Sequence, residues 1–175
     1  MLDSLFRDIR SLTFRGLIQN PLTYLGALVV LGDQLTKLLL TSHMPVHEGR
    51  VIIPGFLNLV HARNTGAAFS LLAGSHTVWR QALFVAVSVL ALGVIAYLLS
   101  CTPKEETWTR RGLVLILAGA LGNLIDRLRF GEVVDFLDFY LGNLHWPAFN
   151  VADSAITAGA GILLVTLLSV KPIRS

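Results

Sequence analysis

Four long apolar runs constrain what this chain can fold into more than any other feature. They cover approximately residues 22–40, 78–100, 111–124 with its flanks, and 151–170. A helix needs about 20 apolar residues to cross the ~30 Å hydrocarbon core of a membrane, and three of the runs are near that length. The third is long enough only if Asn123, Asp126 and Arg127 are carried on its last turns, facing protein or water. The sequence therefore predicts an all-α membrane protein with four transmembrane helices.

The composition fits this class of protein. Hydrophobic residues make up 54% of the 175 residues and charged residues only 14%, against about 25% charged residues in soluble domains. The formal net charge of +3 comes from scattered Lys and Arg rather than from a basic run, so we expect no nucleic acid partner. The single cysteine, Cys101, excludes an intramolecular disulfide and a cysteine-based metal cluster.

Basic residues indicate how the helices are oriented. Lys and Arg are more frequent in the N-terminal segment, the 101–111 connection and the C-terminal tail than on the other side of the helices. Because cytoplasmic segments of membrane proteins are enriched in Lys and Arg, we expect both termini in the cytoplasm. The predicted organisation is a cytoplasmic N-terminal segment that can lie on the membrane surface, a four-helix transmembrane domain and a cytoplasmic tail: 1–20, 21–170 and 171–175.

The two connections on the outer side differ in composition. Residues 41–77 combine β-branched residues, partial alternation and a Pro-Gly turn, which predicts a small strand pair lying against the membrane. Residues 127–150 are rich in Phe, Tyr and Trp, which collect at the headgroup level of membranes. Only the first connection therefore predicts strands.

Charged residues inside the apolar runs need partners. Asp33 and Lys37 are four apart on the first predicted helix with the acid first, which favours an ion pair, although Lys37 can also extend toward the outer surface. Asn123, Asp126 and Arg127 form one polar patch on the third. The positive charge of Arg127 beside Asp126 favours the ionised form of that carboxyl, so we interpret Asp126 as structural rather than as a proton carrier.

Small residues recur at a spacing of four in the third and fourth predicted helices. The pairs are Ala118 with Gly122 and Ala155 with Gly159. This spacing lets helix backbones come close together in membranes. We therefore expect the third and fourth helices to be in close contact.

Asp135 and Asp153 differ from the other acids, because neither has a basic residue within four positions. Each is set among apolar side chains, and the predicted topology places both at the outer face of the membrane. Two close carboxyl groups share a proton, which allows one to act as a base and the other as an acid toward water. The alternative is that Asp153 only caps the fourth helix and Asp135 bonds a local backbone group. Spacing alone leaves both interpretations open.

Other chemistries have less support. The histidines show no HExxH spacing, and the sequence has no GxSxG motif and no glycine-rich phosphate loop, so we expect neither a metal nor a cofactor. A proton-coupled transporter could use the four acids Asp33, Asp126, Asp135 and Asp153 as a relay. However, no repeat halves or paired broken helices are visible. A passive membrane adaptor would leave the two unpaired aspartates without a purpose.

Five short motifs can be set together in chain order. They are DQLTK at 33–37, NTGAAFS at 64–70, GNLIDR at 122–127, VVDF at 133–136 and FNVADS at 149–154. Their order and spacing resemble the bacterial lipoprotein signal peptidase family, also called signal peptidase II. The resemblance spans about residues 22–170 and leaves out the N-terminal segment and the tail.

The resemblance implies a fold and an activity. The family architecture has four transmembrane helices, a small extracytoplasmic sheet and a short outer helix. The implied activity is that of an aspartyl endopeptidase of the inner membrane, with its active site toward the periplasm. It would remove the signal peptide from diacylglyceryl-modified prolipoproteins, cutting just before the lipidated cysteine. The resemblance also implies a monomer without a cofactor, in contact with membrane lipid and inhibited by cyclic peptides such as globomycin.

The motifs carry the family's functional positions onto this chain. Asp135 and Asp153 match its catalytic pair. Further positions match residues that line or support the site: Asn64, Gly66, Asn123, Arg127 and Asn150. Asp33 and Lys37 match a polar pair that supports the active site, and Asp126 matches a supporting position.

Overall fold

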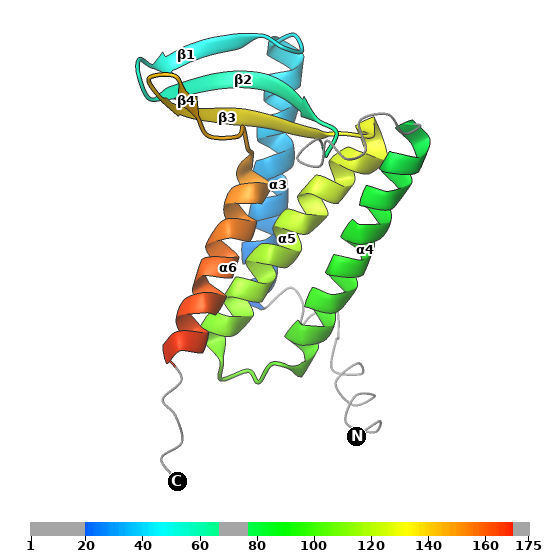
Figure 1. The fold of residues 1–175 in the computed structure, drawn as a ribbon. Helices are drawn as coiled ribbons and strands as arrows, with labels where there is room; N and C mark the ends of the chain where they lie inside the picture. The colour runs from blue at the N-terminus through cyan, green and yellow to red at the C-terminus, as the bar shows by residue number, and fades with distance from the viewer. Residues whose placement is uncertain (1–19, 67–76, 170–175) are drawn as a thin grey trace.

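In the described part of the chain, four long helices form a bundle with a small β-sheet at one end (Figure 1). The computed structural model describes residues 20–66 and 77–169, so the predicted N-terminal segment and tail lie outside the described residues. The helices are α3 (Pro21–His43), α4 (Thr77–Cys101), α5 (Thr107–Phe130) and α6 (Val151–Ser169). They correspond to the four apolar runs of the sequence.

Three of these helices, α3, α4 and α6, are long and apolar enough to cross a membrane. The helix α5 is of similar length, but it carries Arg110 and Arg111 near its start and three charged residues in its last two turns. It packs against all three other helices, so much of its surface faces protein (Figure 1). The prediction of four transmembrane helices is therefore confirmed for three of them by length and composition.

Glycines allow α5 and α6 to pack closely. A side chain at Gly119 would collide with the backbone of Ala152, and one at Gly159 would lie 2.5 Å from the carbonyl oxygen of Gly112. The predicted close contact of these helices is confirmed. Gly122, which the sequence assigned to the same contact, also faces α3, where a Cβ atom would lie 2.7 Å from Asp33 Oδ2.

The sheet is antiparallel, with its four strands in chain order. The strands are β1 (Gly49–Ile53), β2 (Leu57–Asn64), β3 (Val133–Leu141) and β4 (Leu144–His145). The predicted strand pair in residues 41–77 is confirmed as β1 and β2. The second connection supplies β3 and β4, which the aromatic composition did not predict. Its described residues 131–150, like 44–66 of the first connection, contain no short helix, while 67–76 lie outside the described residues.

An apolar cluster attaches the sheet to the bundle. Leu40 and Met44 at the end of α3 are buried against Val134 and Phe136 of β3. At the end of α5, Gly131 adopts a left-handed conformation with φ of 76°, which stops the helix and sends the chain directly into β3. The start of β3 is thereby held beside the last turns of α5 and the end of α3.

Candidate active site

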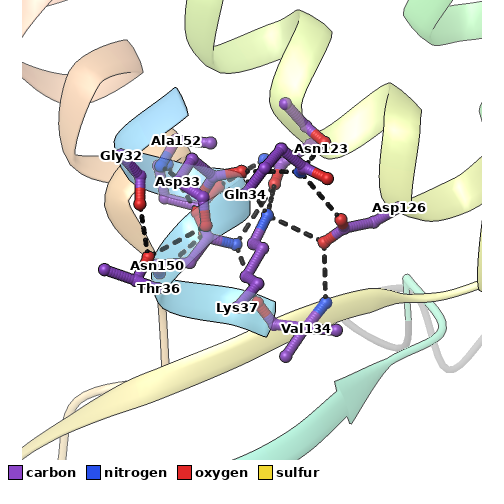
Figure 2. A network of polar contacts seen from close by, with 12 residues as sticks. Gly32, Asp33, Gln34, Thr36, Lys37, Asn123, Asp126, Val134, Asn150 and Ala152 are labelled. Atoms are coloured by element: carbon purple, nitrogen blue, oxygen red, sulfur yellow. Dashed lines mark hydrogen bonds and ion pairs between the residues drawn. The ribbon is translucent and has the colours of Figure 1, made fainter. Parts of the chain in front are cut away.

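A cluster of polar side chains is buried where the bundle meets the sheet (Figure 2). Its members come from α3, α5, β3 and the residue before α6: Asp33, Lys37, Asn123, Asp126, Asp135 and Asn150. Buried charges and amides are costly unless they are hydrogen-bonded, so their contacts determine how the surrounding elements can be arranged.

Lys37 lies at the centre of this cluster (Figure 2). Its Nζ atom is 2.8 Å from Asp33 Oδ2 and 2.7 Å from Asp126 Oδ2, and it also donates to Asn123 Oδ1 at 3.3 Å. The predicted Asp33–Lys37 ion pair is confirmed. Arg127 and Asp126 attract each other through their charges, but the basic group that Asp126 contacts comes from α3. The partner of Asp126 is Lys37.

Asp33 also holds the start of α6. Its Oδ1 atom accepts a hydrogen bond from the Ala152 N–H at 2.9 Å, across the contact between α3 and α6 (Figure 2). Ala152 immediately precedes Asp153. The carboxylate on α3 therefore fixes the backbone beside the second predicted catalytic aspartate.

Asp126 holds the start of β3 in the same way. Its Oδ2 atom accepts a hydrogen bond from the Val134 N–H at 3.1 Å, and Val134 immediately precedes Asp135. Each carboxylate bound to Lys37 thus supports the backbone next to one predicted catalytic aspartate. A single ammonium group joins the two supports.

Gln34 completes this network and was missed by the sequence reasoning. Its Nε2 atom donates to Asp33 Oδ2 at 3.1 Å, Asp126 Oδ1 at 3.1 Å and the Gly122 carbonyl at 3.2 Å. The available signal was its polar side chain inside an apolar run, in the DQLTK motif.

Asp135 is a buried residue of β3 with two amide partners. Its Oδ2 atom accepts from Asn64 Nδ2 at 2.9 Å and its Oδ1 atom from Asn150 Nδ2 at 2.8 Å. Burial raises the pKa of Asp135 to about 6. The two amide hydrogen bonds oppose this rise, and the negative charge of Asp153 adds to it. Asp135 is therefore a carboxyl group that holds its proton to a higher pH than an ordinary aspartate does.

Gly66 orients the amide of Asn64. Its N–H donates to Asn64 Oδ1 at 2.9 Å, so the Nδ2 group of Asn64 is directed at Asp135. Gly66 has a φ of 83°, and a side chain there would collide with the ring of Phe84 on α4. Both features require glycine at this position.

Asp153 lies in the first turn of α6. Its Oδ1 atom accepts from Asn123 Nδ2 at 2.7 Å and its Oδ2 atom from the Asn150 N–H at 3.3 Å, while the Asp153 N–H donates to Asn150 Oδ1 at 2.8 Å. This reciprocal pair is a capping box, in which Asn150 is the capping residue. The alternative in which Asp153 is itself the cap is wrong.

Asn150 contacts both aspartates. Its Nδ2 group donates to Asp135 and its backbone N–H to Asp153, and the residue is fully buried. In the described part of the chain, neither carboxyl forms a salt bridge with Lys, Arg or His. The negative charge of Asp153 also acts on Asp135, and two carboxyl groups coupled in this way can act as base and acid toward a water molecule.

Arg127 lies near enough to both aspartates for their charges to act on it, but its direct contacts are with other groups. Its guanidinium is 5.7 Å from the centre of the Phe84 ring, and Nη1 donates to the Asn123 carbonyl at 3.4 Å. The described residues include no hydrogen bond between Arg127 and either Asp135 or Asp153. They also include no group of three or more His, Cys, Asp or Glu side chains placed to hold a metal ion.

Comparison with known proteins places these residues in a family context. A family model described as signal peptidase (SPase) II matches residues 25–169. The lipoprotein signal peptidase of Syntrophus aciditrophicus is 45% identical over 150 residues, covering 86% of this chain and 93% of that protein. The one from Francisella tularensis subsp. novicida is 43% identical over 157 residues, covering 89% and 97%.

Two solved structures of a bacterial membrane enzyme have a similar fold. The structure at 1.9 Å resolution aligns with a TM-score of 0.76 and 32% identity, covering 86% of this chain and 94% of that chain. The structure at 2.3 Å aligns with a TM-score of 0.77 and 32% identity, covering 88% and 91%. The similarity therefore extends over most of the chain.

Proposed function

This chain belongs to the signal peptidase II family, and from that premise we propose that it is an aspartyl endopeptidase that releases the signal peptide from diacylglyceryl-modified prolipoproteins. The proposed cut lies just before the lipidated cysteine. Membership in a peptidase family favours a protease over the transporter and adaptor alternatives. The proposal assigns the chemistry to Asp135 and Asp153, without a metal or a nucleophilic side chain.

The arrangement of Asn150 between the two aspartates carries this proposal. It brings a buried carboxyl with a pKa of about 6, Asp135, together with a carboxyl at the start of a helix, Asp153. Asp135 is accordingly the acid of the proposed pair and Asp153 the base.

The proposed reaction uses these two protonation states. Asp153 takes a proton from water as the water oxygen bonds to the scissile carbonyl carbon, and Asp135 gives its proton to the carbonyl oxygen. The tetrahedral intermediate then loses its C–N bond. Asp153 gives its proton to the departing nitrogen, and a hydroxyl of the intermediate returns a proton to Asp135. Both carboxyl groups end the cycle as they began it.

The surrounding amides support these roles. Asn64 and Asn150 each donate to one oxygen of Asp135, which fixes the plane of the carboxyl group. Asn123 does the same for Asp153. We assign Gly66 and Arg127 to the walls of the substrate site, and Asp33, Lys37 and Asp126 to its support.

The proposed location is the inner membrane, with the sheet and the site toward the periplasm. The connection between α4 and α5, which carries Lys104, and the start of α5, which carries Arg110 and Arg111, lie at the end of the bundle opposite the sheet (Figure 1). Basic connections favour the cytoplasmic side. We further propose a monomer, with residues 1–20 and 171–175 in the cytoplasm and with inhibition by cyclic peptides such as globomycin.

The test is cleavage of a diacylglyceryl-modified prolipoprotein in detergent, followed by gel shift and by mass spectrometry of the new N-terminus. We expect Asp135→Asn and Asp153→Asn each to lower the rate by at least about 100-fold, the scale of general acid–base catalysis. Normal cleavage by either variant would remove the aspartate pair from the mechanism. Equal cleavage of the unmodified precursor would contradict the proposed substrate class.

Asp138→Asn is the matched control, because Asp138 lies on the same strand and is also buried. Burial acts to raise its pKa, but hydrogen bonds from Asn58 and His145 outweigh this and lower it. Its contacts are therefore with the outer part of the sheet. We expect the variant to retain cleavage.

A further inference from the structure

A second candidate site lies at the end of the bundle opposite the sheet. A pocket of about 520 Å³ opens there between the start of α3 and the connection from α4 to α5. Among the described residues, its lining includes three basic side chains, Lys104, Arg110 and Arg111, and no acidic one. Such a pocket is suited to an anionic group.

Two of the three basic groups in this pocket are held in place by uncharged partners. Arg110 Nη1 donates to the carbonyl oxygens of Leu99 and Thr102 at 3.1 and 2.6 Å, and the Arg111 guanidinium lies 4.8 Å from the centre of the Trp108 ring. Glu105 and Glu106 belong to the same connection. Within the described residues, however, no salt bridge joins an acid to any of the three basic side chains.

The basic pocket continues into an apolar groove. This groove, of about 740 Å³, runs between α3, α4 and α5, and Asn20, Leu22 and Arg110 line both spaces. Beyond the shared residues its walls are mostly apolar or small, as at Ala27 and Leu121. The combined space is therefore charged at its mouth and apolar along its length.

The depth of the groove matches one leaflet of a membrane. Along α5 the lining extends from Arg110 to Leu121, which is roughly 16 Å at ~1.5 Å per residue, or about half of the ~30 Å hydrocarbon core. An acyl chain of a phospholipid in that leaflet has this reach. A membrane-spanning helix would need a groove of full depth.

We propose that this pocket and groove bind a phospholipid with an anionic headgroup. Its phosphate would lie against Lys104, Arg110 and Arg111, and one acyl chain would occupy the groove. In the proposed orientation this end meets the cytoplasmic leaflet, which is rich in anionic lipids. A signal peptide is a poorer occupant because its first segment is positively charged. The chain's own residues 1–19 also carry more basic than acidic side chains.

Native mass spectrometry of the full-length protein in detergent tests the proposal, with phosphatidylglycerol and phosphatidylcholine of identical acyl chains as probes. We expect wild type to prefer phosphatidylglycerol. The variant Lys104→Gln/Arg111→Gln should lose about tenfold or more of that preference, because each basic group near a membrane surface contributes about fivefold. Free glycerol phosphate, which lacks acyl chains, should bind far more weakly than the lipid.

A second variant tests the groove. Ala27→Phe places a ring in the groove and should lower phosphatidylglycerol binding, whereas Ala91→Phe, on an exposed position of α4 outside the groove, should not. Arg50→Gln removes a basic group at the sheet end and is the charge control. It should keep the lipid preference of wild type.

Three results would overturn the proposal. Equal binding of the two lipids by wild type would show that the groove takes membrane lipid without regard to its headgroup. An undiminished preference in the double variant would show that the basic pocket does not bind the headgroup. A dimer that Ala27→Phe converts to a monomer would assign the groove to a second copy of the chain. Prolipoprotein cleavage is measured in parallel, so a failure of the proposed peptidase activity is distinguished from a failure of lipid binding.

Discussion

Asn150 both caps α6 and holds Asp135. Its side-chain oxygen accepts from the Asp153 N–H, and its side-chain nitrogen donates to Asp135, Asn123 and the Val134 carbonyl. The capping bond stabilises the helix, whereas the bond to Asp135 orients a reacting group. Substitution can separate these two effects.

We expect Asn150→Ala to lower the free energy of unfolding by about 1 kcal/mol through loss of the cap, and to lower cleavage as well. Asn150→Ser retains a capping oxygen but lacks the amide that reaches Asp135. It should therefore be more stable than Asn150→Ala by about the 1 kcal/mol of the cap, while still losing at least about tenfold in kcat/KM, since a misplaced acid is a poor catalyst. Full activity of the serine variant would show that the bond to Asp135 has no catalytic part.

The raised pKa of Asp135 predicts a pH dependence of activity. The proposed mechanism needs Asp135 protonated, so kcat/KM should fall as pH rises through about 6 in the free enzyme. Stability should follow the same direction. In the unfolded chain this carboxyl ionises at a pH near 4, whereas in the folded protein it keeps its proton up to about pH 6. The unfolded state is therefore increasingly favoured between these pH values, and the free energy of unfolding falls as pH rises from ~4 toward about 6.

The stability part of this prediction can be checked separately from catalysis. Thermal melting of wild type should show the loss of stability between these pH values, and Asp135→Asn should not, because asparagine does not titrate. Asp138→Asn should keep the wild-type profile in this window, because the pKa of Asp138 is lowered and does not enter it. An unchanged profile in Asp135→Asn would assign the transition to another group.

At the scale of elements, the contact between α5 and α6 controls where Asp153 lies. Gly119 on α5 faces the backbone of Ala152, one residue before Asp153. A methyl group at position 119 must push the start of α6 away from α5. The bond from Asn123 to Asp153 crosses the same contact, so it would lengthen with this shift.

We therefore expect Gly119→Ala to reduce cleavage strongly, by at least about tenfold for a displacement near 1 Å of a catalytic group. Gly93→Ala on α4 is the matched control, because a Cβ atom there meets nothing within 4 Å. Alanine in a helix is favoured over glycine by about 1 kcal/mol, so this control should be neutral or slightly stabilising. Equal activity of the two variants would show that α6 tolerates the shift.

At the scale of the whole molecule, Lys37 joins elements that are far apart in the sequence. It links α3 to α5 directly and, through Asp33 and Asp126, to the starts of α6 and β3. Its removal would leave two buried carboxylates without a positive partner. Uncompensated buried charge is among the most costly defects in a folded protein.

We expect Lys37→Met, which keeps the length of the side chain, to lower the free energy of unfolding by about 3–5 kcal/mol. The exposed pair of Arg50 and Glu48 provides a control, since Arg50→Gln should change stability by less than about 1 kcal/mol. Thermal melting in detergent measures both. Adding Asp126→Asn to Lys37→Met should recover part of the loss, and no recovery would argue against unpaired charge as the cause.

The sequence predicts those parts of this structure that depend on local spacing. The apolar runs give the helices, and the spacing of four between Asp33 and Lys37 gives their ion pair. The pairing of β2 with β3 joins segments about 75 residues apart, and no local pattern in the aromatic connection indicates it. The contact of Lys37 with Asp126 likewise depends on how α3 packs against α5.

The candidate site shows the same limit. The lack of basic neighbours singles out Asp135 and Asp153, and the predicted topology places both at the same end of the bundle. The sequence spacing predicts no contact beyond this. The amide that contacts both, Asn150, was expected in the site only from the motif. Its hydrogen bonds depend on the crossing of β3 and α6, and these positions are fixed by tertiary contacts.

Synthesis from the N-terminus presents α3 to the membrane before α5 exists. At that stage Asp33 and Lys37 neutralise each other within one helix, so α3 enters the bilayer without net charge in its span. Asp126 is synthesised later, on α5, the described helix that is not apolar enough to count as a membrane span. Its ionic partner, Lys37, is then already present on α3. In the proposed topology, insertion of α5 is thereby coupled to its docking on α3, and the polar support for the starts of β3 and α6 forms before α6 docks.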